Sequence, residues 1–435
     1  MNLRWIDPVE LVEHELTQQE DEGRDVTDLR RRWRAAASQN LPASDLRILA
    51  DSLLNQMGAP GEISGHVEPT GTPSPEPDVL VPPATVPANR IAGGWFGRAA
   101  GCLLGKPVEG MSRQVIRELL ESNGSWPLSD YVTQKGIPPK LLHEHPWNKH
   151  HGRESLRENI VCMPEDDDMN YPMVNLAVLE SAGKDFSTEQ VAEAWLGMLP
   201  VLSTFTAERV AYGNLLAGLV PPETATHRNP YREWIGAQIR GDIFGWVSPG
   251  NPRAAAALAF KDARLSHVRN GIHAEMFVAA MVAAACVVVD PRDVVETGLR
   301  TIPRDSRLAE AVRFALSLPD AESTWEEAVD RLYERFSRYH WVHAINNAAL
   351  VAAALVYGKG DFERSICNVV MGGWDTDSNG ATVGSIVGTM LGQERLPARW
   401  IKPLQNRIRT SLKGYDNSAI STLAERTCAL ASTSQ

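Results

Sequence analysis

The sequence predicts an all-α protein built from many packed helices. From residue 91 onward, segments rich in Ala, Leu and Val alternate with breaks that contain Gly, Pro or Asn. Alternating β-branched runs are sparse and no series of strand–helix repeats occurs, which argues against a doubly wound sheet. Hydrophobic residues make up 43% of the 435 residues, enough for a sizeable core. We therefore expect one compact multi-helix domain.

The first 56 residues predict a helical extension to that domain. Asp7-Pro8 suits the start of a helix, and apolar residues recur after it at helical spacing. The basic run at 30–34 is typical of a solvated helix face, with a partner-binding arm as the alternative.

A proline-rich segment follows the extension. Residues 57–90 scatter prolines among Gly, Ser, Thr and Glu, which predicts a linker or an extended strap. The helical body should begin near Asn89. We therefore expect a catalytic domain at 91–435.

Each helix of that domain is predicted from apolar periodicity between breaks. The segments are 92–105, 112–121, 170–182, 188–198, 206–218, 231–240, 252–264, 270–289, 291–300, 306–317, 324–337, 343–357, 362–371, 379–392 and 403–412.

Two of these segments carry glycines four residues apart. Each glycine costs a helix roughly 1 kcal/mol relative to alanine, so their recurrence indicates that a backbone or a ligand approaches closely. Tight helix packing and a ligand-facing wall are both consistent with this spacing. The glycines are Gly97, Gly101 and Gly105 in the first segment and Gly380, Gly384, Gly388 and Gly392 in the second.

Composition narrows the class of protein. The formal net charge is −11, which disfavours general binding to nucleic acid or anionic membranes. The five cysteines are widely spaced without a CxxC pair, which indicates reduced thiols. The N-terminus lacks the apolar core of a secretory signal, and the longest apolar run, 276–289, is shorter than the ~20 residues that span a bilayer. We expect a soluble, cytoplasmic protein.

Two acidic clusters are the strongest chemical signals. Glu165-Asp166-Asp167-Asp168 precedes an apolar helix, and Asp375-Thr376-Asp377-Ser378 precedes the second glycine-rich helix. One or two such carboxylates cap a helix, but four in a row repel each other unless a cation is bound. Oxygen ligands without clustered His or Cys favour Mg²⁺, with Mn²⁺ or Ca²⁺ as alternatives.

The first glycine-rich segment is not a phosphate loop. Only three residues separate Gly101 from Gly105, and Pro107 stands where a Walker loop needs Ser or Thr. No strand precedes it, so it is not a dinucleotide fingerprint either. Glu109, just beyond this helix, is either a surface residue or part of a site.

Taken together, these motifs resemble the ADP-ribosylglycohydrolase family, which includes dinitrogenase-reductase-activating glycohydrolase and the ADP-ribosyl-acceptor hydrolases. The glycine-rich helix with Pro107-Val108-Glu109, the acidic cluster before a helix and Gly373-Trp374-Asp375-Thr376-Asp377-Ser378-Asn379 occur in the family's order. The resemblance covers roughly residues 90–415 and leaves 1–88 uncovered. It implies a compact all-α fold around two Mg²⁺ ions.

The resemblance implies roles for individual residues. It assigns the metal ligands as Asp166, Asp167, Asp168, Asp375, Asp377 and Ser378. It implies that Glu109, Asp167 or Asp168 transfers the proton in catalysis. Relatives show hydroxyl–Asp–Asp–hydroxyl at the second motif, whereas this chain has only acids, so the register is open by one residue. We place Asp166 in the position of the first hydroxyl, which puts Asn170 where a polar residue is common.

Further substrate-contacting residues are implied by the middle of the chain. Segments around 236–242 and 262–267 resemble pocket segments of one subgroup. For each residue a structural role is the alternative: a core-edge salt bridge, a turn cap, a satisfied histidine or core packing. With Asn170 and Trp374, which lie outside these segments, the full set is Asn170, Gln238, Arg240, Asp242, His267 and Trp374.

We therefore expect a Mg²⁺-dependent glycohydrolase that cleaves the N- or O-glycosidic bond of an ADP-ribosyl group. The partner is an ADP-ribosylated protein or a small ribosylated metabolite. Hydrolysis of a small, nucleoside-like N-riboside by the same machinery is the first alternative, and the altered acidic cluster favours it. A non-catalytic ADP-ribose-binding module is the second, and the intact carboxylates argue against it.

Overall fold

The computed structural model describes residues 4–39, 41–58 and 80–432. Within these ranges the chain forms twenty-one α-helices, five short 3-10 helices and one two-stranded antiparallel sheet. The predicted all-α class is confirmed. Most of the predicted strap at 57–90 lies outside the described residues.

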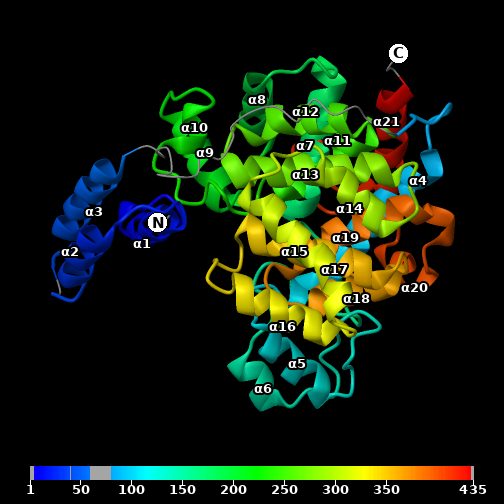
Figure 1. Cartoon of the computed structure of the whole chain (residues 1–435), viewed down its shortest axis with the longest axis horizontal. Coiled ribbons are helices and arrows are strands. Elements are labelled where there is room, and N and C mark those ends of the chain that lie inside the picture. Colours follow the sequence, from blue (N-terminus) through cyan, green and yellow to red (C-terminus); the bar gives the residue numbers. More distant parts are fainter. Residues whose placement is uncertain (1–3, 40, 59–79, 433–435) are drawn as a thin grey trace.

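Figure 1 shows three N-terminal helices lying together at one side of a larger helical body. These helices are α1 (Pro8–Asp21), α2 (Thr27–Ala37) and α3 (Ala43–Met57).

The body contains all the remaining elements. Its longer helices are α4 (Ala88–Gly105), α5 (Arg113–Ser122), α7 (Asp167–Ala182), α8 (Thr188–Met198), α9 (Thr206–Leu216), α12 (Pro252–Ala263), α13 (Arg269–Ala285), α14 (Pro291–Leu299), α15 (Arg307–Ala321), α16 (Trp325–Phe336), α17 (Ala344–Gly358), α18 (Phe362–Met371), α19 (Thr376–Leu391) and α21 (Ile420–Ser432). The short elements are η1 (Lys106–Val108), α6 (Pro139–Glu144), η2 (Val201–Ser203), α10 (Glu223–Thr226), η3 (Gln238–Arg240), α11 (Asp242–Trp246), η4 (Gln393–Arg395), α20 (Ala398–Ile401), η5 (Lys402–Leu404), β1 (Arg407–Ile408) and β2 (Ser418–Ala419).

The glycine stripes of α4 and α19 face each other. A Cβ atom added to Gly97 would overlap the carbonyl oxygen of Gly384, and one added to Gly101 would overlap that of Gly380. The two backbones are therefore in direct contact, which only glycine permits. The contact ends where the Thr376 hydroxyl donates to the Gly105 carbonyl over 2.8 Å. It sets the C-terminus of α4 against the N-terminus of α19.

Two predicted helices are wrong. Within 231–240 only Gln238–Arg240 is helical, because the Ile235 N–H donates to the Val342 carbonyl and the Glu233 carbonyl accepts from Ala344. Within 403–412 the chain forms the end of η5 and then strand β1, which pairs with β2. Tertiary hydrogen bonds override the helical pattern in both places. The helices α6, α10, α11, α20 and α21 were not predicted.

The N-terminal helices pack on the body through a second, smaller core. Val12 and Leu16 of α1 join Val210 of α9 and Trp234 in one buried apolar cluster. Buried ion pairs reinforce this contact: Arg232 binds Glu15 and Glu22 at 2.7 Å each. The extension is therefore held by charge as well as by apolar area.

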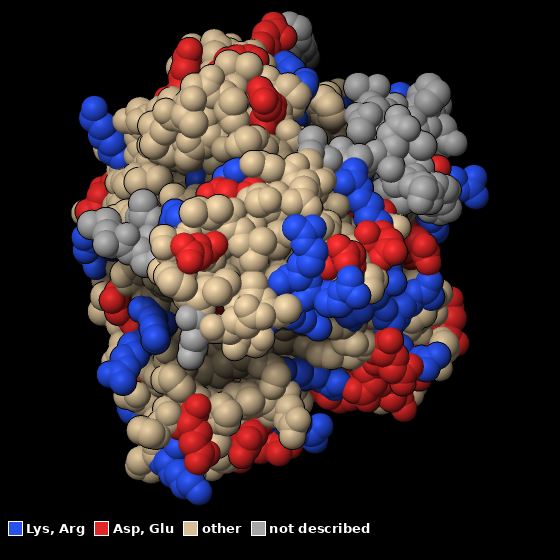
Figure 2. Space-filling model, turned by 90° about the vertical axis from the view of Figure 1, so that its left-hand side faces the viewer, with Lys and Arg blue, Asp and Glu red and all other residues tan. Residues whose placement is uncertain are grey.

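The basic run at 30–34 lies on α2. Arg30 pairs with Glu13 at 2.6 Å and Glu20 at 2.7 Å, and Arg34 pairs with Glu13 at 3.3 Å. Figure 2 views the side of the molecule from which the N-terminal helices project, where Lys and Arg side chains gather beside a hollow, with Asp and Glu side chains next to them.

All five cysteines are free thiols, as expected. No helix in the described ranges is long and apolar enough to cross a membrane.

Candidate active site and metal centre

Three separate segments bring six carboxyl groups together. Asp166 caps α7 by accepting from the Asp168 N–H at 3.0 Å, and Asp167 and Asp168 begin that helix. Asp375 and Asp377 lie at the start of α19, and Glu109 follows η1. The α4–α19 contact makes this possible, because it places the end of one glycine helix beside the start of the other.

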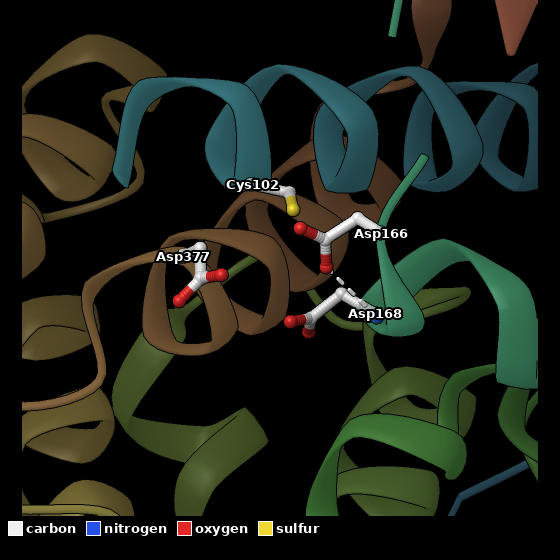
Figure 3. Close-up of side chains that lie close together, drawn as sticks. All are labelled: Cys102, Asp166, Asp168 and Asp377. Atoms are coloured by element: carbon white, nitrogen blue, oxygen red, sulfur yellow. Dashed lines mark hydrogen bonds between the residues drawn. The ribbon is translucent and has the colours of Figure 1, made fainter. Parts of the chain in front are cut away.

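The carboxylates form two sets that share one member. Ligand atoms of Cys102, Asp166, Asp168 and Asp377 all lie within 4.8 Å of one another, and Figure 3 shows these side chains pointing toward each other between α4, α7 and α19. Ligand atoms of Glu109, Asp375 and Asp377 form a second set with the same limit. Asp377 therefore stands between two candidate cation positions.

Lys106 lies inside this acidic cluster. Its Nζ is 2.6 Å from Asp166 Oδ2, 2.7 Å from Asp377 Oδ2 and 2.9 Å from Glu109 Oε2. Burial alone would lower the pKa of Lys106, but Asp166, Asp377 and the neighbouring acids raise it well above its ordinary value. The ammonium group is thus a fixed positive charge at the centre of the cluster.

Asp168 is tied to its surroundings on both oxygens. Arg98 donates to Oδ1 at 3.2 Å, and the Ser378 hydroxyl donates to Oδ2 at 3.0 Å. Arg98 is itself fully buried and also bonds Asp242 at 2.7 Å. These contacts fix the orientation of Asp168.

The pKa values reflect the crowding of negative charge. Burial raises the pKa values of Asp167, Asp168 and Asp375 well above the usual range of aspartate, and neighbouring carboxylates raise them further. For Asp377 burial also acts upward, but Lys106 holds its pKa below the ordinary value. Protons or a bound cation must relieve this repulsion.

The donor set fits a hard divalent cation. Asp375 occupies the N-cap position of α19, yet its side chain makes no capping hydrogen bond to that helix. Asp377 Oδ1 is buried and has no hydrogen-bond partner among the described residues. Carboxylate and hydroxyl oxygens with unused lone pairs are the ligands that Mg²⁺, Mn²⁺ and Ca²⁺ take.

A pocket of about 320 Å³ opens above the carboxylates. Its floor includes Lys106, Glu109, Asp167, Asp375, Asp377 and Ser378. Its rim is aromatic and comes from other parts of the chain: Trp5, His14, His150, Phe205, Trp234, His340 and Trp341. Arg4 and Glu10 line it too, so α1 and the turn before it form part of the wall.

The turn before α19 is conformationally strained. Trp374 has φ +57°, in the left-handed region, and Gly373 before it has φ +79°. Trp374 is 6% exposed and stacks on Tyr333 with ring centroids 4.5 Å apart. Left-handed non-glycine residues concentrate at functional sites, where packing holds them in place. Asp375 follows this left-handed residue directly and begins the α19 part of the cluster.

Among the residues predicted to contact substrate, four lie behind the pocket wall. Arg240 is fully buried and binds Asp262 at 2.5 Å and Glu208 at 3.1 Å, so the salt-bridge alternative describes its contacts. His267 is fully buried with Nδ1 2.8 Å from the Ser266 hydroxyl. The other two, Gln238 and Asp242, are fully buried as well and do not line the pocket.

Asn170 and Trp374 are also absent from the pocket lining. The Asn170 amide donates to Glu165 at 3.4 Å and its carbonyl accepts from Thr410. Asn170 lines a smaller neighbouring cavity together with Lys106, Asp166 and Asp167.

Several residues in and around the pocket are not marked by any motif of the sequence. Lys106 was considered only as part of a phosphate loop, although its i,i+3 spacing to Glu109 is a signal for a local ion pair. Glu208, which lines the pocket, has its pKa raised to about 7 by burial. No local pattern could have placed Trp5 or His14 at the rim, because they lie in a segment far from the motifs.

The chain is similar to several known proteins. An uncharacterized protein of Archaeoglobus fulgidus is 26% identical over 318 residues, which cover 72% of this chain and 90% of that protein. The solved structure of an ADP-ribosylglycohydrolase-related protein complex aligns at 19% identity with a TM-score of 0.48, over 80% of this chain and 99% of that one. The family profile described as ADP-ribosylglycohydrolase matches residues 83–434. That match spans most of the sequence and confirms the resemblance carried by the motifs: the chain belongs to the ADP-ribosylglycohydrolase family.

Proposed function

We propose that this protein is a divalent-metal-dependent glycohydrolase that cleaves the N- or O-glycosidic bond between a ribosyl group and its acceptor. One observation carries the proposal: five carboxyl groups from three segments meet in two sets that share Asp377, and the set of Glu109, Asp375 and Asp377 lines an open pocket. Family membership supports the reaction class.

We assign the metal to these sets, with Mg²⁺ as the ion and two ions as the stoichiometry. Asp166, Asp168 and Asp377 would hold one ion, and Asp375, Asp377 and Glu109 the other. When bound, such an ion supplies Lewis-acid chemistry, including activation of water and orientation of ribose hydroxyls.

The chain's own residues suit glycosidic cleavage. The bond breaks through an oxocarbenium-like state, whose positive charge nearby carboxylates stabilise. Glu109 and Asp167 line the pocket, whereas Asp168 is held by Arg98 and Ser378. We therefore assign proton transfer to Glu109 or Asp167 and a positioning role to Asp168.

Two substrate classes follow from this machinery. The first is an ADP-ribosyl group on a protein side chain or small acceptor, the class named by the family. The second is a small N-riboside, and one observation favours it: the pocket is near the lower end of the ~300–1,000 Å³ that ligand sites occupy. A purely ADP-ribose-binding role leaves the paired carboxylate sets without a use.

Incubation with a substrate panel tests the proposal. The protein is mixed with Mg²⁺, Mn²⁺ or Ca²⁺ and ADP-ribosyl-arginine, ADP-ribosyl-serine, O-acetyl-ADP-ribose and simple ribosides, and released ribosyl product is measured. We expect product that disappears with EDTA and returns with Mg²⁺.

The matched variant is Asp375→Asn/Asp377→Asn. We expect it to fold, to bind no Mg²⁺ in calorimetry and to lose at least ~10³-fold in turnover, as expected when charged groups facing the reacting centre are removed. Full turnover in this variant, or turnover by the wild type in EDTA, contradicts the metal-dependent mechanism.

A further inference from the structure

The N-terminal segment supplies part of the pocket. Arg4, Trp5, Glu10 and His14 line it together with the carboxylate floor. These residues lie outside the part of the chain that the family profile matches, which starts at residue 83. This wall is therefore an addition to the shared fold.

The added wall is aromatic and joins rings of the body. Trp5 meets Phe205 edge-on at 5.4 Å between ring centroids, and His14 meets Trp234 edge-on at 5.6 Å. His340 stacks on Trp234 at 4.2 Å. Burial lowers the pKa of His340 to about 4, so that ring is neutral at pH 7. These uncharged rings lie above the carboxylate floor. Their faces and edges suit contact with an aromatic base.

The Lys and Arg side chains of the pocket lining offer few free donors for phosphate groups. Six acids line it: Glu10, Glu109, Asp167, Glu208, Asp375 and Asp377. The two basic residues of the lining are already paired, Lys106 with three carboxylates and Arg4 with Glu10 at 3.8 Å. Diphosphates are normally bound by Arg and Lys with free donors. A ligand without a diphosphate does not need such free donors.

The wall is anchored firmly enough to select a ligand. Glu15 and Glu22 of the N-terminal segment bind the buried Arg232. Arg232 lies two residues before Trp234 and three before Ile235, and both of these line the pocket. The Asp21 carbonyl accepts from Arg307 at 2.8 Å. The same residues that fix α1 thus fix one side of the pocket.

We propose that the N-terminal segment is a specificity element that narrows the site to small ribosides with an aromatic, neutral or cationic base and no phosphate, the base lying against Trp5 and His14. The inference rests on the proposed glycohydrolase function and names its substrate class.

A charge and size series tests the substrate class. The wild-type enzyme is assayed with Mg²⁺ on inosine, adenosine and nicotinamide riboside, on AMP and nicotinamide mononucleotide, and on ADP-ribosyl-arginine. We expect kcat/KM to fall at least about tenfold from each riboside to its 5′-phosphate, and further for the ADP-ribosyl compound. Glu10→Gln should reduce the discrimination between riboside and 5′-phosphate, because it removes one negative charge from the wall.

Substitutions test the aromatic wall directly. Trp5→Ala and His14→Ala should each lower kcat/KM for the ribosides about tenfold, the scale of one lost base-stacking contact of ~1–3 kcal/mol. Trp5→Phe should restore most of that loss. Ile48→Ala is the matched control, since Ile48 of α3 is 69% exposed and lies outside the pocket lining. Unchanged thermal unfolding and Mg²⁺ binding show that each variant is intact.

The outcomes separate the two proposals. Equal or better turnover of ADP-ribosyl-arginine, or no effect of Trp5→Ala and His14→Ala, overturns the specificity element and leaves the glycohydrolase in place. If nothing in the panel is hydrolysed, the glycohydrolase proposal fails. Binding measured by calorimetry then tests the specificity element by itself. In that case we expect adenosine to bind the Glu109→Gln variant more tightly than ADP-ribose does, and we expect Trp5→Ala to weaken the binding of adenosine. Tighter binding of ADP-ribose than of adenosine overturns the inference.

Discussion

The floor and the rim of the pocket are held in place by different physics. The floor depends on α4 and α19, whose backbones touch along glycine stripes with no side chain between them. The rim on the N-terminal side depends on α1, which buried ion pairs to Arg232 attach to the body. The carboxylates of the floor are thus positioned by a close backbone contact, and the aromatic wall is positioned by buried ion pairs together with apolar packing. We expect the two regions to fail under different perturbations.

The largest expected effect comes from filling the glycine contact. Gly101→Ala places a Cβ where the Gly380 carbonyl oxygen lies, and neither backbone can yield without moving a helix. We expect a loss of at least about 4 kcal/mol in the free energy of unfolding, the range that overpacking reaches only when nothing can shift. Urea unfolding measures this.

The matched control for this prediction is Gly213→Ala. Gly213 lies within α9, and nothing is within 4 Å of an added Cβ. We expect it to gain about 0.5–1 kcal/mol, as helical glycines with room for a methyl group do. Similar effects of the two substitutions would remove the steric account of the floor.

Breaking the attachment of α1 should come next. Arg232→Met leaves Glu15 buried without an ion-pair partner and Glu22 with Arg269 alone, which costs about 3 kcal/mol. The damage should stay at the rim: limited proteolysis should release the N-terminal helices, while calorimetric Mg²⁺ binding at the floor stays within about twofold of wild type. Loss of Mg²⁺ binding in this variant would show that floor and rim are not independent.

Acid should loosen the rim through Glu233. Burial would raise the pKa of Glu233, but Arg307 and Arg269 lower it to about 2. A carboxyl group whose folded-state pKa is depressed adds stability that is complete above its unfolded value of 4.5 and is lost as the pH falls toward 2. The pKa of nearby Asp21 shifts in the opposite direction. Burial raises it to about 6, so the ionised Asp21 carboxylate lowers the free energy of unfolding above that pH.

The measurement for this prediction is the urea midpoint between pH 7 and pH 3. We expect the wild-type midpoint to fall in the acid part of the range, and Glu233→Gln to show a flatter profile. Parallel profiles in the two proteins would assign the acid sensitivity to other carboxylates.

The smallest expected effect concerns Lys106 at the floor. Its ammonium lies 2.6–2.9 Å from three carboxylate oxygens, where it competes with a bound cation. Lys106→Met should tighten Mn²⁺ binding, measured by electron paramagnetic resonance, by about tenfold, because a like charge is removed from a buried site. The exposed Lys140→Met is the control. Weaker Mn²⁺ binding in Lys106→Met would mean that the lysine organises the carboxylates instead of competing for them.

Local sequence pattern was enough to find candidate site residues where several polar residues lie close together in the chain. The clusters around 166–168 and 375–378 stood out as candidate cation sites from their dense carboxylates, and the family resemblance named their residues as ligands. The structure brings the two clusters together. The glycine stripes predicted a close approach but did not name the partner. The helix expected at 231–240 failed because its backbone bonds to 342–344, a contact no local window contains.

By itself, the sequence determined the helical class, the family and the carboxylates that form the floor. Helix periodicity and dense acidic motifs are local signals, because each depends on residues that are close together in the chain. The tertiary structure alone decided which residues surround them. It moved Arg240 and His267 into a buried network, set Lys106 among the acids and brought Trp5 and His14 to the rim. These outcomes depend on burial and on contacts between segments up to hundreds of residues apart, and such contacts leave no periodic trace in the chain.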